Sequence, residues 1–344
     1  MQHTHARRGL LSGGNWIIDH VKLIDKFPDQ DTLASIVGRS RGTGGAPYNV
    51  LINLAKMQAQ FPLAGVGLVG DDEDGRTIVA DCTAAGIDMA QVRTTQAAGT
   101  SYTDVMTVQS TGRRTFFHSR GANSLLDDAD FHLEECNARI LHLGYLLLLD
   151  RMDVVAADGT TGASRLLRRA RALGIKTSVD VVSEHGDRFA KVVTPALPHT
   201  DYLIVNELEA AKSSGIDVLK NGTLDFALVS RAAARLLELG VREWVVVHAP
   251  AGALARHKDG TVHVQGSVAM PPEKIAGTAG AGDAFATGTL LGLHEGWPMP
   301  ECLRMGACAA ATSLLHPTCT GGILPAEACL RFGADLGFRP PPLG

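Results

Sequence analysis

The stretch from Gly277 to Gly296, GTAGAGDAFATGTLLGLHEG, contains the residues with the clearest chemical potential. Small residues run as far as Gly282, and Asp283 and a helical pattern of apolar residues follow. A glycine-rich turn that leads into a helix points several backbone N–H groups outward, and the helix dipole adds partial positive charge there. Such a helix start can stabilise an anion, including a phosphoryl group during its transfer.

Asp283 falls in the first turn of this predicted helix. Its carboxylate could accept the proton of an attacking hydroxyl while the backbone at Gly280, Ala281 and Gly282 holds the phosphate. The alternative is a helix cap, because Asp is a favoured capping residue and glycine-rich turns are common. Taken alone, this short motif favours the cap.

Three further motifs precede this one in the chain: GTGGAPYNVLINLAKM at 42–57, GLVGDDEDG at 67–75 and NELE at 206–209. Together with GAGDAF at 280–285, they resemble the signatures of the PfkB family, the ribokinase-like carbohydrate kinases. The four motifs stand in the family's order and at its usual distances, and the resemblance covers about residues 12–325. The sequence has no GxxxxGK[ST] motif, so it does not resemble a P-loop kinase.

The resemblance implies that Asp283 is the catalytic base and that Gly280, Ala281 and Gly282 form the anion hole. It implies ATP and Mg²⁺ as cofactors. The family usually has Asp where this chain has Gly277, and that Asp helps to hold a monovalent cation in several members. Whether a monovalent cation activates this protein therefore stays open.

Asn206 and Glu209 match the family motif that helps to organise magnesium and the phosphates. They stand at the end of the predicted strand 201–207, at the carboxyl edge of the sheet, where α/β folds bind ligands. Mg²⁺ prefers oxygen ligands and often keeps its water, so Glu209 is expected to contact it through water. The alternative for Glu209 is an ordinary first-turn helix carboxylate. His248 and Gly252 are expected to line the nucleotide pocket.

Seven residues match substrate-contacting positions of the family or could reach the cleft: Asn15, Asp19, Gly44, Gly45, Asn49, His118 and Arg120. Asp19 is predicted to end the first strand, GGNWIID, where an acid commonly binds sugar hydroxyls in the family. Amides and carboxylates suit a polyol, because they pair with several hydroxyls, and Arg120 could grip a carboxylate or phosphate. The structural alternatives are an edge strand or a turn for Asp19, a tight turn for Gly44–Gly45, a helix start for Asn49, a packed lid residue for His118 and a solvated loop for Arg120.

The elements that must position these residues follow an α/β pattern. Apolar runs at 139–146, 176–182, 201–207 and 243–249 read as strands, and helix-like runs lie at 162–173, about 187–194 and 223–239. Near-continuous apolar strands that alternate with amphipathic helices predict a parallel sheet covered on both faces. The hairpin-like segment 101–118 and the extended pieces in 20–38 stand outside this rhythm, which suggests a small β lid.

We therefore expect a ribokinase-like α/β fold with a central, mostly parallel sheet flanked by helices. The predicted kinase domain is 12–338, with a lid formed by about 20–43 and 98–120, and flexible termini at 1–11 and 339–344.

Composition narrows the function classes. The 344 residues carry a net charge of −4 without a basic cluster, which argues against nucleic-acid binding. The longest apolar stretch, 140–149, is interrupted by His142 and Gly144 and is too short to span a membrane. The six cysteines form no CxxC pair and are expected to be buried thiols in a reducing cytoplasm. A homodimer is expected by the resemblance.

The sequence thus predicts an ATP-dependent kinase for a hydroxyl of a sugar or sugar-like substrate. The main alternative is a nucleoside kinase of adenosine type, for which Trp16, beside the proposed substrate residues, could form the floor of a base site. A non-catalytic sugar-sensing protein ranks lower, because Asp283 is present. A dinucleotide-binding oxidoreductase ranks lowest. The glycine-rich fingerprint of that class is missing after the first strand, where only GGN occurs.

Overall fold

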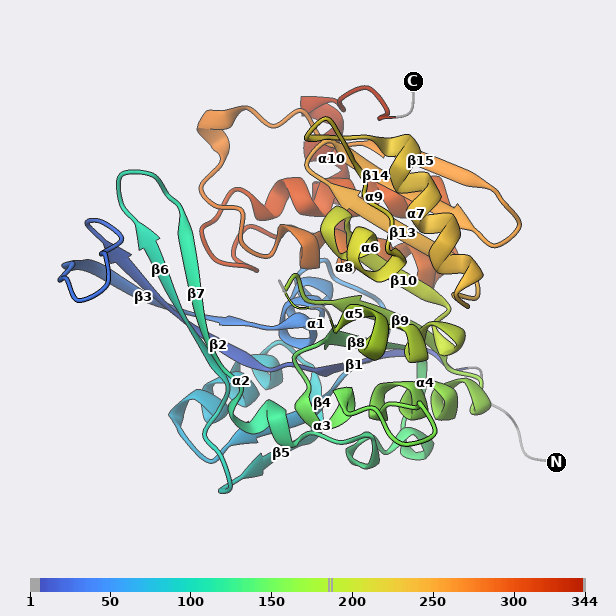
Figure 1. Cartoon of the computed structure of the whole chain (residues 1–344), viewed down its shortest axis with the longest axis horizontal. Helices are drawn as coiled ribbons and strands as arrows, with labels where there is room; N and C mark the ends of the chain where they lie inside the picture. The colour runs from blue at the N-terminus through green and yellow to red at the C-terminus, as the bar shows by residue number, and fades with distance from the viewer. Residues whose placement is uncertain (1–6, 185, 187, 343–344) are drawn as a thin grey trace.

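The computed structural model describes residues 7–342 apart from residues 185 and 187. Within these residues, nine strands form one large sheet (Figure 1). Their spatial order is β15 (Val262–Gly266), β14 (Gly252–His257), β13 (Trp244–Ala249), β10 (Tyr202–Asn206), β9 (Lys176–Val181), β8 (Ala138–Leu146), β1 (Gly9–Gly14), β4 (Leu63–Gly70) and β5 (Asp88–Thr95). From β13 to β5 every neighbouring pair is parallel, whereas β14 and β15 continue the sheet as antiparallel edge strands.

Helices cover both faces of this sheet, and each face has its own apolar core. One face carries α1 (Ala46–Lys56), α2 (Glu73–Ala84), α8 (Ala281–Glu295), α9 (Met299–Ser313) and α10 (Ala326–Leu336). The other face carries α3 (Asp150–Asp153), α4 (Gly162–Ala172), α5 (Phe189–Val192), α6 (Glu207–Ser214) and α7 (Phe226–Glu238). The strands are apolar nearly throughout because both of their faces are buried. The predicted α/β class, the four central strands and the helices at 162–173 and 223–239 are confirmed.

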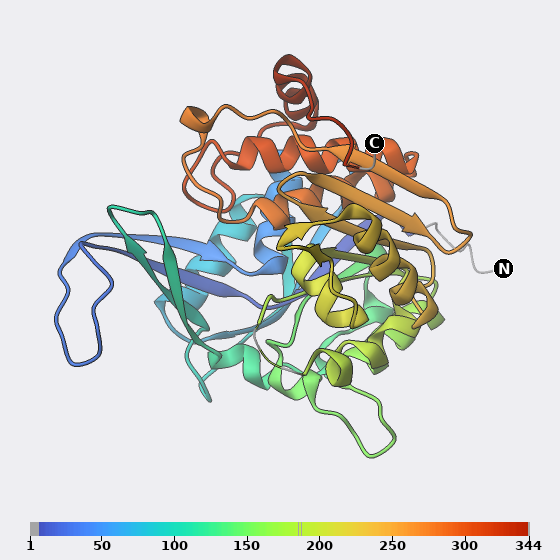
Figure 2. The ribbon, with the colours of Figure 1, turned by 45° about the horizontal axis from the view of Figure 1, so that its top comes forward.

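A second, smaller sheet projects from the side of the large one (Figure 1). Its strands, in spatial order, are β3 (Ile36–Gly44), β2 (Ile17–Ile24), β6 (Tyr102–Val108) and β7 (Arg114–Ser119). Figure 2 shows that the β2–β3 and β6–β7 connections extend away from the rest of the chain. The strands β2 and β3 overlap one of the two segments predicted for the lid, and β6 and β7 overlap the other. The turn of the 101–118 hairpin includes Gly112, as predicted. A short pair, β11 (Leu219–Lys220) and β12 (Thr223–Leu224), lies before α7.

The prediction that Asp19 ends the first strand is wrong. The first strand of the large sheet ends at Gly14, and Asp19 is the third residue of β2 in the small sheet. Gly14 permits this change of direction, because it has φ +130° and a Cβ there would overlap the carbonyl of Gly144. The chain therefore passes between the sheets earlier than the continuous run GGNWIID suggests.

Within the described residues, parts of the two segments predicted as flexible termini, 1–11 and 339–344, are held by the rest of the fold. Residues 9–11 are buried in the centre of the large sheet as part of β1, because their apolar side chains fill both cores. Arg339 is held by a backbone hydrogen bond to Ser267 of 2.8 Å. Residues 1–6 and 343–344 lie outside the described part of the chain. The helix expected at about 187–194 is also shorter, since α5 spans Phe189–Val192 and a proline-containing 3-10 helix (Thr194–His199) follows it.

No described helix combines the length and the apolarity needed to cross a bilayer. All six cysteines are free thiols, and four of them are buried. Cys302 and Cys308 both lie on α9, as their spacing suggested.

Candidate active site

Five polar or aromatic side chains stand at or just beyond the carboxyl ends of neighbouring parallel strands: Asn15, Tyr145, Asp180, Asn206 and His248. Strand pairing places Gly14 opposite Gly144 and Asn206 opposite His248. Helices α1 and α8 pack against each other beside this edge. Ligands of α/β folds bind at this edge of the sheet, so the topology brings the predicted site residues of distant segments together.

Asp283 lies in the first turn of α8 and is 8% exposed. Its Oδ1 accepts a hydrogen bond of 2.6 Å from the hydroxyl of Tyr145, and its Oδ2 accepts one of 2.7 Å from Nδ2 of Asn49. Burial raises the pKa of Asp283 above its ordinary value, and the two hydrogen bonds oppose this rise because they stabilise the carboxylate. The group is a buried acid with a tuned pKa, as expected of a general base.

The start of α8 is open for an anion. Its N-cap residue, Gly280, has a left-handed φ of 74°, and no side chain caps the helix. The first N–H groups of a helix have no partner within the helix; that of Ala281 donates to the carbonyl of Thr278 at 3.4 Å, and those of Gly282 and Asp283 are the ones available to a ligand. The side chain of Asp283 bonds to Tyr145 and Asn49 and does not cap the helix. The structural alternative for Asp283 is therefore not supported.

Small residues at this turn are required by their neighbours. A Cβ on Gly280 would lie 2.6 Å from Cβ of Cys319, and one on Gly282 would lie 3.1 Å from Cε1 of His248. A Cβ on Gly277 would meet Cα of Pro317 at 2.9 Å. The loop that contains Pro317 and Cys319 therefore packs directly on the glycine turn and leaves no room for the acid that the family usually has at position 277.

Asn206 and Glu209 form a reciprocal cap at the start of α6. Oδ1 of Asn206 accepts from the Glu209 N–H at 2.9 Å, and Oε2 of Glu209 accepts from the Asn206 N–H at 2.9 Å. Ser183 donates to Oε1 of Glu209 at 2.7 Å. Burial raises the pKa of Glu209 to about 7, with a further contribution from the negative charge of Asp283. Glu209 is thus a first-turn carboxylate of α6, as the structural alternative predicted, and its role toward a ligand stays a prediction.

Asp180 is a site residue that the motif analysis missed. It lies in β9 close to its carboxyl end, is 8% exposed, and its pKa is raised well above the ordinary value by burial and by the charges of Glu209 and Asp283. Its position near the end of the predicted strand 176–182 could have identified Asp180 from the sequence, because the carboxyl ends of parallel strands gather at the ligand-binding edge. In the described part of the chain, no three His, Cys, Asp or Glu side chains meet as a ready-made metal cluster.

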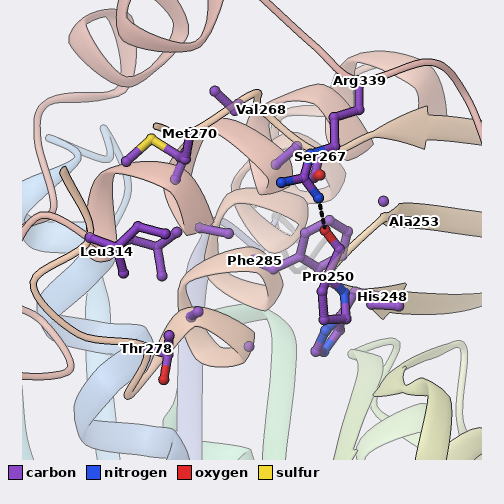
Figure 3. Close-up of a pocket in the computed structure, with 18 of the residues that line it drawn as sticks. His248, Pro250, Ala253, Ser267, Val268, Met270, Thr278, Phe285, Leu314 and Arg339 are labelled. Carbon is purple, nitrogen blue, oxygen red and sulfur yellow. Dashed lines mark hydrogen bonds between the residues drawn. The ribbon is translucent and has the colours of Figure 1, made fainter. Parts of the chain in front are cut away.

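On the other side of α8 lies a cavity of about 400 Å³ (Figure 3). Apolar side chains of Met270, Phe285 and Leu314 line it, together with His248 and Gly252. Burial lowers the pKa of His248 to about 4, so its imidazole is neutral at physiological pH. The cavity adjoins the glycine turn through Ala281 and Gly282. Both residues predicted for the nucleotide pocket therefore line one cavity beside the predicted anion site.

Asp19 faces this region from β2 of the small sheet. A Cβ on Gly44 would lie 2.8 Å from its Oδ2, so Gly44 makes room for this carboxylate. Burial raises the pKa of Asp19 to about 6, the neighbouring Thr103 opposes the rise, and the charge of Asp283 adds to it. Thr103 in turn bonds Nδ1 of His118 at 3.0 Å. Asp19, Thr103 and His118 stand side by side across three strands.

Asn15 does not face the cleft. It is fully buried, its Oδ1 accepts from the N–H of Tyr145 at 2.6 Å, and its Nδ2 donates to the carbonyl of Leu148 at 3.1 Å. Gly45 packs so closely on the carbonyl of Asn15 that a Cβ would overlap it. The structure therefore gives Asn15 and Gly45 a supporting role, because they hold Tyr145 and the start of α1 in place.

Arg120 is engaged within the protein. Its Nη1 donates to the carbonyl of Leu147 at 2.9 Å and lies 3.2 Å from Oδ1 of Asp150. Trp16, the aromatic residue considered as a floor for a nucleoside base, is fully buried and donates from Nε1 to the carbonyl of Val66 at 3.0 Å. The contacts of Arg120 direct one end of its guanidinium toward Leu147 and Asp150, and the single polar side-chain atom of Trp16 is used within the protein.

Comparison with known proteins agrees with this fold. The model of the pfkB family carbohydrate kinases matches residues 9–327. A 5-dehydro-2-deoxygluconokinase of Clostridium perfringens is 23% identical over 300 residues, which are 84% of this chain and 83% of the relative. A ribokinase of Arabidopsis thaliana is 26% identical over 84% of this chain and 71% of the relative. The solved structure of an Arabidopsis thaliana ribokinase with ribose and ATP matches with a TM-score of 0.78 and 23% identity, covering 96% of this chain and 99% of the other.

Proposed function

The chain belongs to the pfkB family of carbohydrate kinases, and from this premise we propose that it transfers the γ-phosphate of ATP to a hydroxyl of a sugar or sugar-like substrate. One observation carries the proposal: Asp283 lies between two different sites. The helix start and the apolar cavity lie on one side of it, and Asp19 of the small sheet lies on the other. This arrangement suits a base that works between a nucleotide and a polyol.

In the proposed mechanism, the substrate binds between Asp19 and Asp283, and the triphosphate lies along the turn at Gly280–Gly282. The carboxylate of Asp283 takes the proton of the substrate hydroxyl while the hydroxyl oxygen forms a bond to the γ-phosphorus. The bond between the γ-phosphorus and the β–γ bridging oxygen breaks, and ADP leaves. The N–H groups at the start of α8 stabilise the charge on the phosphoryl oxygens.

Mg²⁺ fits this site by the chemistry of its side chains. Asp180 and Glu209 are buried carboxylates, the charge of Glu209 raises the pKa of Asp180, and none of the described salt bridges includes either residue. A divalent cation would relieve this repulsion, and oxygen ligands are those that Mg²⁺ prefers. We propose that Asp180 and Glu209 hold it, partly through water, where it would neutralise charge on the phosphates.

Three further features belong to the proposal. We propose that the small sheet acts as a lid, which excludes water during transfer. The apolar side chains of Ile36, Val37, Phe116 and Phe117 on this sheet are at least 51% exposed, which supports a homodimer that covers them. A cytoplasmic location also stays a prediction.

The test is ADP release from ATP and Mg²⁺ across pentoses, hexoses, sugar acids, phosphosugars and nucleosides. A hit among the sugars or sugar derivatives supports the proposal and names the acceptor. A hit with adenosine alone would replace it by a nucleoside kinase, which the burial of Trp16 disfavours. Silence across the panel, with ATP binding intact, would overturn it in favour of a non-catalytic sensor.

A further inference from the structure

The tail that follows α10 lies along the rim of the apolar cavity. Three backbone contacts fix it there. The N–H of Arg339 donates to the carbonyl of Ser267 at 2.8 Å, and the N–H of Ala269 donates to the carbonyl of Gly337 at 2.9 Å. Val268 pairs with Phe338 in an antiparallel bridge. The guanidinium of Arg304 lies 5.7 Å from the centre of the Phe338 ring. The tail is therefore an ordered extension of the sheet at this point.

Arg339 places a cation at the mouth of this cavity (Figure 3). Its Nη1 donates to the carbonyl of Pro250 at 3.4 Å, and no described salt bridge includes it. A guanidinium has five N–H donors in a fixed fork, so most of them stay available. Beside it, Oγ of Ser267 is buried without a hydrogen-bond partner among the described residues. Arg339 and Ser267 thus form a polar strip beside the apolar lining of the cavity, whose other polar side chains are Glu207, His248 and Thr278.

The position of this strip indicates which part of a nucleotide it would meet. In Figure 3, Arg339 and Ser267 lie at the opposite end of the cavity from Thr278, with Phe285 between them. Thr278 belongs to the glycine turn, where the phosphates are proposed to lie. The apolar side chains of Met270, Phe285 and Leu314 suit a flat base. The strip at the far end is therefore placed for the base and ribose.

We propose that Arg339 is a nucleotide-binding residue that donates hydrogen bonds to acceptor atoms on the base or ribose of the bound nucleotide. This inference rests on the proposed function and deepens it. Arg339 lies outside residues 9–327, which the family model matches, so no family motif assigns it. The backbone of the tail holds the side chain at the rim, because the N–H of Arg339 is bonded to Ser267.

The experiment compares Arg339→Ala and Arg339→Lys with the unchanged protein. Calorimetry measures the binding of ADP and of inorganic tripolyphosphate, and kinetics measure KM for ATP and for the sugar. Arg339 is exposed, so the variants should fold normally. Arg331→Ala is the matched control, because Arg331 is an exposed arginine on α10 that pairs with Glu327 and does not line the cavity.

We expect Arg339→Ala to weaken ADP binding and raise KM for ATP about tenfold, as for the loss of hydrogen bonds from a charged group. In Arg339→Ala we expect no change in tripolyphosphate binding, in kcat or in KM for the sugar. The ADP affinity of Arg339→Lys should lie between that of the unchanged protein and that of Arg339→Ala. Unchanged ADP binding would overturn the inference, and so would an equal loss for tripolyphosphate, which would place Arg339 on the phosphates. If the proposed function is wrong, the protein without any substitution will instead show no kinase activity.

Discussion

The hydroxyl of Tyr145 donates a 2.6 Å hydrogen bond to Oδ1 of Asp283, although 138 residues separate the two in the chain. With Asn49 on Oδ2, both carboxylate oxygens of the proposed base are held by neutral donors. These donors favour the ionised form, whereas burial favours the protonated form. The pKa of Asp283 depends on this balance, and Tyr145 and Asn49 fix the orientation of its carboxylate.

Replacing the proposed base should remove turnover and leave the fold intact. We expect Asp283→Asn to lower kcat about 10³-fold, in the range for general-base catalysis, because an amide cannot accept the proton. Binding of ADP and the circular dichroism spectrum should be unchanged. Asp335→Asn, on the exposed surface of α10, serves as the control. Turnover near the original level in Asp283→Asn would remove Asp283 from the mechanism.

Removing the Tyr145 hydroxyl should change the pH dependence. In Tyr145→Phe the carboxylate loses a hydrogen bond that lowers its pKa, so the pKa of Asp283 should rise. The acid limb of kcat/KM against pH should then move to higher pH. Tyr102→Phe, on the small sheet, is the control. A pH profile that Tyr145→Phe leaves in place would show that Tyr145 only fills space.

Asp19 should act on the acceptor and not on the nucleotide. We expect Asp19→Asn to raise KM for the sugar at least tenfold, because a carboxylate accepts stronger hydrogen bonds from hydroxyls than an amide does. KM for ATP should stay the same, since Asp19 does not line the nucleotide cavity. Steady-state kinetics with each substrate varied in turn separate the two effects. A rise in KM for ATP alone would contradict this placement.

The same substitution should stabilise the free protein at high pH. The pKa of Asp19 is about 6 in the fold and ordinarily 3.8, so the folded state binds more protons between these values and loses stability as pH rises through them. Asp19→Asn avoids this loss and should gain about 3 kcal/mol at pH 8. The gain should vanish near pH 3, where Asp19 is protonated in both states. Urea unfolding at the two pH values measures it, and an equal effect at both would refute the assignment.

Glu209 should affect the requirement for Mg²⁺. We expect Glu209→Gln to raise the Mg²⁺ concentration for half-maximal activity at least tenfold, as for other groups that support a metal through water. Calorimetry should show weaker binding of MgADP but unchanged binding of metal-free ADP. Glu238→Gln, at the exposed end of α7, is the control. If both forms of ADP bind Glu209→Gln more weakly, then the damage lies in the cap of α6.

The sequence by itself determined the fold class and the position of the proposed base. Strands such as β8 and β10 are buried on both faces, so their sequences are apolar nearly throughout and predict a covered parallel sheet. The turn before Asp283 needs small residues, and its glycines are visible in the sequence for that reason. Asn206 and Glu209 are equally readable, because a capping box acts over three residues.

Only the tertiary structure decided which distant groups meet. Nothing near Tyr145 in the sequence indicates that its hydroxyl reaches Asp283, and nothing near Asn15 indicates that its amide is used up by the backbone that carries Tyr145. The tail at Arg339 resembled a loose end because its neighbours are prolines and glycines, but its order comes from pairing with a strand extension about 70 residues earlier. Hydrogen bonds between segments leave no local pattern, since each partner is satisfied by a group that folding alone brings near.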